Sequence, residues 1–207
     1  MVAIIDYGVG NLFSLRCSFE KIGAEVVVTS DAAVLRHADK LILPGVGAFE
    51  DAAEKLKTSG LDIVVKEEVD KGKPLMGICL GMQMLFEKSY EYGEHEGLGI
   101  LRGKVVGMEG QLPDELAIPH IGWNALHFHQ PQCPLFRHIK ENDCVYFVHS
   151  YFAVECEESL AATTEYGIQL TAAVAKGNVY GCQFHPEKSG QVGLNILKAF
   201  CELETEK

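Results

Sequence analysis

The chain has 207 residues, of which 47% are hydrophobic and 23% charged, which is typical of a folded globular protein and excludes a disordered one. This length fits a single domain, and we take residues 1–207 as that domain. The formal net charge of −11, with no stripe of lysine and arginine, argues against binding to nucleic acid or to an anionic membrane surface.

The sequence shows no targeting or membrane signal. Residues 1–6 lack the basic flank and long apolar core of a signal peptide. The longest apolar stretch, residues 144–154, is shorter than the roughly 20 residues of a membrane span. The seven cysteines are scattered, and none has the two-residue spacing of a zinc knuckle or redox dithiol. We therefore expect a cytoplasmic protein with reduced thiols, no metal and no cofactor.

Short apolar, β-branched runs alternate with longer amphipathic ones in the first 90 residues. Strands are predicted at residues 2–6, 25–29, 40–43 and 74–79, and helices at residues 11–22, 48–58, 61–71 and 80–87. The repeated order of strand, helix and strand predicts an α/β fold, with a mixed, mostly parallel sheet flanked by helices.

The pattern changes in the second half of the chain. A polar, glycine-containing stretch at residues 90–99 is predicted to be a loop. Strands are predicted at residues 104–108, 123–127, 144–153, 160–164, 170–175 and 179–184. We expect them to extend the same sheet as antiparallel members. Gly177 and Asn178 predict a hairpin turn, and an amphipathic helix at residues 189–204 closes the chain.

Cys79 lies in the sequence Gly77-Ile78-Cys79-Leu80-Gly81, between an apolar strand and an apolar helix. This is the context of a nucleophile elbow, with sulfur in place of the hydroxyl of G-x-S-x-G. A helix N-terminus favours the thiolate form, and the amide of Leu80 can face a developing oxyanion. A structural cysteine buried in a strand-to-helix turn is the alternative.

His185 and Glu187 are the candidate base and its orienting group. They follow a predicted strand, and residues two apart on an extended segment point the same way. The alternative is an exposed pair at a strand end. His127 and His129 alternate on a probable strand and could chelate a metal, but no third ligand is evident, and a polar surface face is preferred.

Two glycine loops are weak candidates for phosphate binding. Gly8-Val9-Gly10 lacks the third glycine of a dinucleotide fingerprint. Gly45-Val46-Gly47 lacks a following Gly-Lys-Ser/Thr. The backbone N–H groups of Val46 and Gly47 are better candidates for completing an oxyanion hole with Leu80.

Residues 77–83 together with His185-Pro186-Glu187 resemble the triad, or class I, glutamine amidotransferases. Residues 6–12, 44–49 and 119–124 resemble the glutaminase subunits of imidazole glycerol phosphate synthase, an enzyme of histidine biosynthesis. The resemblance spans nearly the whole chain and implies a single-domain class I glutamine amidotransferase-like fold.

The resemblance also implies residue roles. Cys79 would attack the side-chain amide of glutamine, His185 would protonate the departing ammonia and then activate water, and Glu187 would hold His185. The residues expected to bind glutamine are Gln83, Glu91, His149, Ser150 and Tyr151. The ammonia would pass to a separate (β/α)₈-barrel cyclase subunit in a heterodimer. The residues expected at that interface are Asn11, Trp123, Tyr146 and Lys188.

Val46 departs from the wider family, in which many members carry Pro-Gly-Gly at residues 44–46. A non-glycine residue restricts the backbone, so we expect the oxyanion loop to rest with its N–H turned away and to flip when the partner binds. Three rival functions remain open: another triad glutaminase, such as that of pyridoxal phosphate synthesis; a non-catalytic assembly subunit; and a cysteine peptidase.

Overall fold

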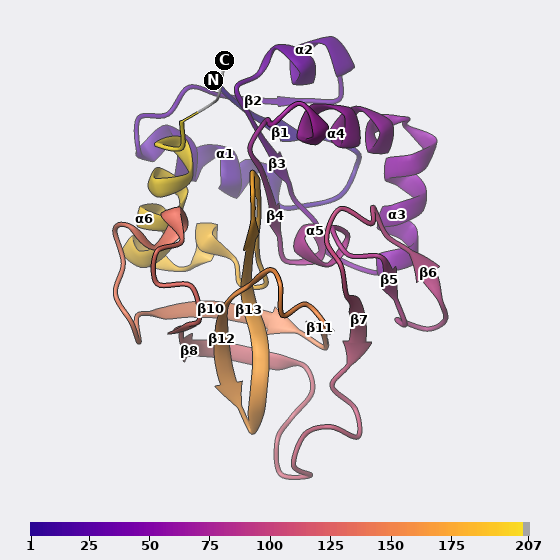
Figure 1. The fold of residues 1–207 in the computed structure, drawn as a ribbon, viewed down its shortest axis with the longest axis vertical. Coiled ribbons are helices and arrows are strands. Elements are labelled where there is room, and N and C mark those ends of the chain that lie inside the picture. Colours follow the sequence, from indigo (N-terminus) through magenta and orange to yellow (C-terminus); the bar gives the residue numbers. More distant parts are fainter. Residues whose placement is uncertain (205–207) are drawn as a thin grey trace.

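An eight-stranded sheet forms the middle of the fold, and the computed structural model describes residues 1–204 of the chain (Figure 1). In spatial order its strands are β2 (Val26–Thr29), β1 (Val2–Ile5), β3 (Lys40–Leu43), β4 (Leu75–Ile78), β14 (Val179–Cys182), β13 (Ile168–Lys176), β12 (Leu160–Tyr166) and β9 (His127–Phe128). The first five are parallel, and the last three pair in antiparallel fashion. The predicted α/β fold with a mostly parallel sheet is confirmed.

Helices cover both faces of this sheet. One face carries α2 (Ala32–His37), α3 (Phe49–Thr58) and α4 (Leu61–Asp70), and the other carries α1 (Leu12–Lys21) and α6 (Gly190–Cys201) (Figure 1). Along β1, Ala3 and Ile5 enter the first core while Val2 and Ile4 enter the second, because successive strand residues point to opposite faces. Helix α2 was not predicted, since it is short and buries only Leu35.

Two smaller sheets correct the expectation that every later strand extends the central one. One contains β10 (Cys144–His149) and β8 (His120–Ala125), and the other contains β11 (Tyr151–Val154), β7 (Lys104–Gly107), β5 (Lys88–Ser89) and β6 (His95–Glu96). The single strand predicted at residues 144–153 is two strands, because the chain changes sheet at Ser150. Strand β6 lies within the loop predicted at residues 90–99.

The helix predicted at residues 80–87 is wrong beyond its first turn, since α5 spans only Leu80–Gln83. The carbonyl oxygen of Met84 accepts a hydrogen bond of 2.8 Å from the amide of Leu98 instead of continuing the helix. This bond joins distant parts of the chain, so the local apolar pattern could not reveal it.

The hairpin predicted at Gly177 and Asn178 joins β13 to β14. Gly177 has a φ of 60°, the left-handed conformation that this turn requires and glycine supplies readily. Helix α6 ends at Cys201, inside the helix predicted at residues 189–204. The last part of the predicted domain, residues 205–207, lies outside the described residues.

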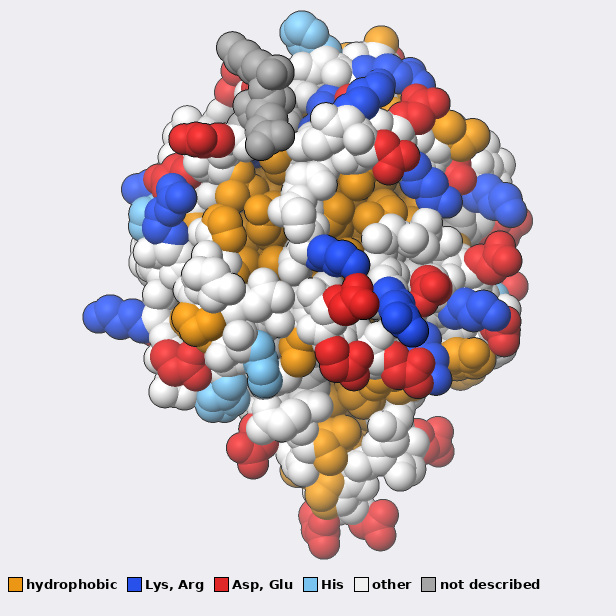
Figure 2. Space-filling model, viewed as in Figure 1, with side chains coloured by type: hydrophobic (Ala, Val, Ile, Leu, Met, Phe, Trp, Pro, Cys, Tyr) orange, Lys and Arg blue, Asp and Glu red, His pale blue; other side chains and the backbone are white. Residues whose placement is uncertain are grey.

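The surface of the described residues mixes charges of both signs. Figure 2 shows basic and acidic side chains interspersed on the face that it views, without a basic stripe. Within residues 1–204 no helix is long and apolar enough to cross a membrane. All seven cysteines are free thiols.

Candidate active site

Three neighbouring parallel strands bring the candidate residues to one edge of the central sheet. Strand β3 ends just before the loop that begins at Pro44, β4 ends just before Cys79, and β14 ends three residues before His185. The carboxyl ends of adjacent parallel strands meet at the same edge, which is where such sheets place their sites.

Cys79 forms the tight turn between β4 and α5, with φ 54° and ψ −114°, a conformation rare for a non-glycine residue. Its amide donates to the carbonyl of Cys182 at 2.8 Å. A Cβ on Gly77 would lie 2.6 Å from the backbone oxygen of Gly81, and one on Gly81 would lie 1.9 Å from that of Leu43. Both glycines are therefore required by close packing around the turn. Because α5 is a single turn, it supplies less dipole to the sulfur than a full helix would.

His185 and Glu187 form a buried pair beside Cys79. Nδ1 of His185 lies 2.8 Å from Oε1 of Glu187, and the two side chains are 3% and 1% exposed. The sequence analysis predicted this contact because residues two apart on an extended segment point the same way, and that prediction of the local backbone is wrong. Residues Pro186–Lys188 form a 3₁₀ turn, and the amide of Lys188 donates to the carbonyl of His185. The turn brings the carboxylate back onto the imidazole.

The environment of His185 favours its protonated form. Burial alone would lower the pKa of the imidazole, but its interactions with Cys79 and Glu187 outweigh burial and raise the pKa from 6.5 to about 9. An imidazolium held next to a sulfur and a carboxylate is the arrangement that an activated thiol and its base require.

Two loops contribute residues whose backbone amides have no protein partner to the lining of this site. Val46, Gly47 and Leu80 line one hollow with Cys79 and His185. Within residues 1–204, no protein acceptor takes a hydrogen bond from the amides of Val46, Gly47 or Leu80. Gly47 has a φ of 90°, which glycine adopts without strain. These amides are available to an oxygen that gains negative charge.

The hollow around Cys79 has a volume of about 360 Å³. It is lined by every residue expected to bind glutamine, namely Gln83, Glu91, His149, Ser150 and Tyr151. It also contains residues that the sequence did not single out for this role, namely Tyr92, Pro119 and Val148.

Gln83 is held in the wall of this hollow rather than projecting into it. Its side-chain nitrogen donates to the carbonyl of Tyr151 at 3.1 Å and to Oε1 of Gln183 at 3.0 Å. The nitrogen of Gln183 in turn lies 3.7 Å from the sulfur of Cys79. Sequence reasoning missed Gln183, although it is a polar residue that follows a buried strand two positions before His185.

Glu91 lies on the loop between β5 and β6, and its carboxylate accepts a 2.8 Å hydrogen bond from the amide of Phe49 at the start of α3. Burial raises the pKa of Glu91, while the amide of Phe49 and nearby His95 oppose that rise. The carboxylate is thus oriented at the rim of the hollow, where an amino group would find a partner.

The residues expected at a subunit interface divide into a cluster and one separate residue. The ring of Trp123, 55% exposed, meets Tyr146 edge to face with centroids 6.0 Å apart. Nζ of Lys188 lies 5.8 Å from the centroid of the Tyr146 ring. Asn11 instead caps α1, accepting a hydrogen bond from the amide of Ser14 at 3.4 Å. Other large hydrophobic side chains that the sequence did not single out are also exposed, namely Phe13, Ile63, Tyr90, Tyr92, Ile118 and Ile121.

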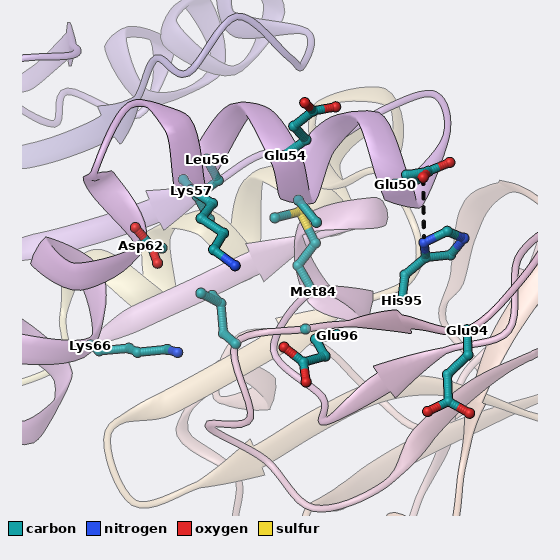
Figure 3. Close-up of a pocket in the computed structure, with 13 residues that line it drawn as sticks. Glu50, Glu54, Leu56, Lys57, Asp62, Lys66, Met84, Glu94, His95 and Glu96 are labelled. Carbon is teal, nitrogen blue, oxygen red and sulfur yellow. Dashed lines mark ion pairs between the residues drawn. The ribbon is translucent and has the colours of Figure 1, made fainter.

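A second hollow, of about 550 Å³, lies between α3, α4 and the segment around β6 (Figure 3). Lys57 and Lys66 extend toward its centre, and Nδ1 of His95 lies 3.8 Å from Oε1 of Glu50. Its lining contains no cysteine, serine or threonine. The larger hollow therefore lacks the thiol or hydroxyl nucleophile that the hollow around Cys79 contains.

His127 and His129 make other contacts than a shared metal would require. Nδ1 of His127 lies 3.5 Å from Oε1 of Glu141, and Nε2 of His129 lies 3.0 Å from the hydroxyl oxygen of Thr163. No group of three or more metal-ligating side chains occurs among residues 1–204.

Comparison with known proteins identifies the family of the chain. The family model described as glutamine amidotransferase class-I matches residues 3–202. The imidazole glycerol phosphate synthase subunit HisH of Oceanobacillus iheyensis is 49% identical, and the match covers 98% of this chain and 99% of that protein. The subunit of the same name from Caldanaerobacter subterraneus subsp. tengcongensis is 50% identical, covering 98% of both chains.

Solved structures share the fold at low sequence identity. A crystal structure of a glutamine amidotransferase has a TM-score of 0.74 at 20% identity and covers 97% of this chain and 99% of that one. A chain of PurLQS from Thermotoga maritima has a TM-score of 0.73 at 18% identity and covers 96% of both chains. The chain therefore belongs to the class-I glutamine amidotransferase family, and within it to the group of imidazole glycerol phosphate synthase subunits HisH.

Proposed function

We propose that this chain is the glutaminase subunit of an imidazole glycerol phosphate synthase. It hydrolyses the side-chain amide of glutamine and supplies the ammonia to a cyclase subunit. The observation that carries the activity is the buried His185–Glu187 pair, with 2.8 Å between Nδ1 and Oε1, whose imidazole lines the same hollow as Cys79. The relatives named HisH support the assignment to this synthase.

The reaction proceeds in two halves. The sulfur of Cys79 attacks the amide carbon. The resulting oxyanion accepts hydrogen bonds from the amide of Leu80 and, once the partner has turned the loop, from those of Val46 and Gly47. His185 gives a proton to the nitrogen, the carbon–nitrogen bond breaks, and ammonia leaves a thioester behind. His185 then takes a proton from water, which attacks the thioester, and glutamate leaves as the sulfur recovers its electron pair.

The glutamine pocket comprises the side chains or backbone of Gln83, Glu91, His149, Ser150 and Tyr151. The carboxylate of Glu91 suits the α-amino group, since it is held at the rim by Phe49. Gln83 acts chiefly by fixing the Tyr151 carbonyl and Gln183.

The partner is a (β/α)₈-barrel cyclase subunit, joined in a heterodimer through the cluster of Trp123, Tyr146 and Lys188 and through Asn11 at the start of α1. Lys188 lines the hollow of Cys79 and also stacks on Tyr146, so it connects the site with this surface. Free thiols at all seven cysteines support a location in the reducing cytoplasm.

Val46 gates the oxyanion hole in this proposal. A non-glycine residue between two glycines restricts the backbone conformations of the peptide whose N–H must point at the substrate. Partner binding is therefore needed to turn this peptide. Glutamine hydrolysis is then coupled to the presence of an ammonia acceptor.

Glutamate release from glutamine tests the proposal, measured with the chain alone and with a cyclase subunit bound to its nucleotide substrate. We expect low activity alone, a large rise in the complex, and none with Cys79→Ala. Activity with a pyridoxal-phosphate-synthase partner instead would indicate the rival glutaminase. No activity in any combination, despite complex formation, would indicate an assembly role and refute the proposal.

A further inference from the structure

A chain of hydrogen bonds runs through β8 and β10 to the wall of the glutamine pocket. Nε2 of His120 lies 2.8 Å from Oδ1 of Asn124. Nδ1 of His120 lies 3.1 Å from Nε2 of His149, its cross-strand partner. Nδ1 of His149 lies 2.9 Å from the carbonyl oxygen of Tyr151. The two histidines are buried, with exposures of 0% and 6%.

These contacts need three protons. The carbonyl oxygen of Tyr151 only accepts, and so does Oδ1 of Asn124, so both ends of the chain are acceptors. Two neutral imidazoles carry one ring proton each. With both histidines neutral and the Asn124 oxygen facing His120, two lone pairs must therefore face each other at one contact.

Two changes remove this conflict. The pair can take up one proton and become a shared cation, which suits the Asn124 oxygen facing His120. Alternatively, the Asn124 amide can turn by half a rotation so that its nitrogen donates to Nε2 of His120, which suits a neutral pair. The turn gives up the 3.0 Å hydrogen bond from Asn124 to the carbonyl of Glu165, which lies at an exposed position.

The surroundings of the pair decide between these states. His120 stacks between Phe147 and Tyr166, with centroids 5.0 and 4.1 Å away. His149 faces His185 across the pocket. The other titratable residues that line the pocket are Cys79, Glu91, Tyr92, Tyr151 and Lys188. Burial lowers the pKa of His120, and burial with the nearby histidines lowers that of His149 to about 3. The neutral pair with the turned amide therefore prevails at neutral pH.

Both states keep the proton of His149 on Nδ1, where it donates to the Tyr151 carbonyl. That carbonyl also accepts from Gln83, so it is held from two sides. We propose that His120 and Asn124 are positioning residues that fix His149 in this tautomer. They thereby hold the carbonyl of Tyr151, which belongs to the wall of the glutamine pocket. The Asn124 amide turns when the pair takes up a proton. The effect on glutamine binding rests on the proposed function, whereas the tautomer does not.

The test is ¹⁵N NMR of the full chain labelled at histidine. In neutral to alkaline buffer, we expect His149 and His120 each to be protonated at Nδ1 and bare at Nε2. Acidification should add one proton to the pair as a whole. Asn124→Asp places a carboxylate, which can only accept hydrogen bonds, next to Nε2 of His120. The apparent pKa of the histidine pair should therefore rise by about 1–3 units.

Asn142→Asp is the matched control, because it makes the same change on an exposed turn and should leave this titration alone. A proton on Nε2 of His149 in the resting protein would overturn the proposal. So would a titration that Asn124→Asp leaves unchanged.

A kinetic measurement in the complex with the cyclase subunit tests the positioning role. His120→Phe keeps an aromatic ring between Phe147 and Tyr166 but leaves Nε2 of His149 without a donor. We expect the KM for glutamine to rise roughly tenfold, with kcat changed by less than about threefold, because a buried group loses its partner without touching the reacting atoms. Unchanged KM would refute this role. The NMR result stands whether or not the chain hydrolyses glutamine, so the two failures can be told apart.

Discussion

Replacing Glu187 by glutamine isolates the contribution of one buried charge to the site. Oε1 of Glu187 lies 2.8 Å from Nδ1 of His185, with the two side chains 1% and 3% exposed. An amide oxygen at the same position can still accept the proton of Nδ1, so the imidazole keeps its orientation. What is lost is the charge assistance of that hydrogen bond, about 1–1.5 kcal/mol, which is the difference between a hydrogen bond to a charged group and one to a neutral group.

This loss lowers the pKa of His185 from about 9 by roughly one unit, since one unit corresponds to about 1.36 kcal/mol. Because His185 is already protonated in the resting site at neutral pH, the rate of thioester formation falls mainly in alkaline buffer, by roughly tenfold above about pH 9, where the fraction of protonated His185 drops by that factor. The raised pKa also has a stability consequence. The charged pair contributes stability that is fully present below pH 6.5 and is lost as the pH rises through about 9. In Glu187→Gln this contribution is smaller and its loss is complete at a lower pH.

The assay is glutamate release by the complex as a function of pH, together with alkylation of Cys79 in the isolated chain, read by mass spectrometry. Both rates should fall, and the alkaline limb should move to lower pH. Glu202→Gln is the matched control, because Glu202 contacts His138 at 2.6 Å on the surface, far more exposed than the Glu187 pair. An unchanged rate and pH profile for Glu187→Gln would refute the assigned role of the pair.

Three further changes test other parts of the site. Val46→Gly should raise glutamate release by the chain without its partner roughly fivefold or more, because the loop peptide can then turn freely, and unchanged basal activity would contradict the gating proposal. Trp123→Ala should weaken cyclase binding by roughly 2 kcal/mol, measured by calorimetry. The control Ile63→Ala alters a side chain that is 58% exposed on α4 and should not weaken binding. Equal effects of the two substitutions would show that Trp123 does not lie in the interface. Gly81→Ala should destabilise the fold by about 1–3 kcal/mol or more in urea denaturation, because its Cβ would lie 1.9 Å from the oxygen of Leu43, and wild-type stability would show that the elbow can relax.

The sequence by itself determined the class of fold and the identity of the candidate triad. Short apolar runs separated by amphipathic ones specify a parallel sheet, because a strand buried on both faces must be apolar throughout. The glycines around Cys79 mark the elbow in the sequence, because any other residue at Gly77 or Gly81 would collide with the backbone.

Only the tertiary structure decided how distant segments meet. The apolar run at residues 144–154 is divided between two sheets at Ser150, because β10 pairs with β8 and β11 pairs with β7. Both partner strands are remote in sequence. The early end of α5 depends on the amide of Leu98, and the closure of Glu187 onto His185 depends on a 3₁₀ turn that alternation along a strand does not describe. The buried pair of His120 and His149 is likewise invisible in the sequence, because its two members are 29 residues apart and meet only through strand register.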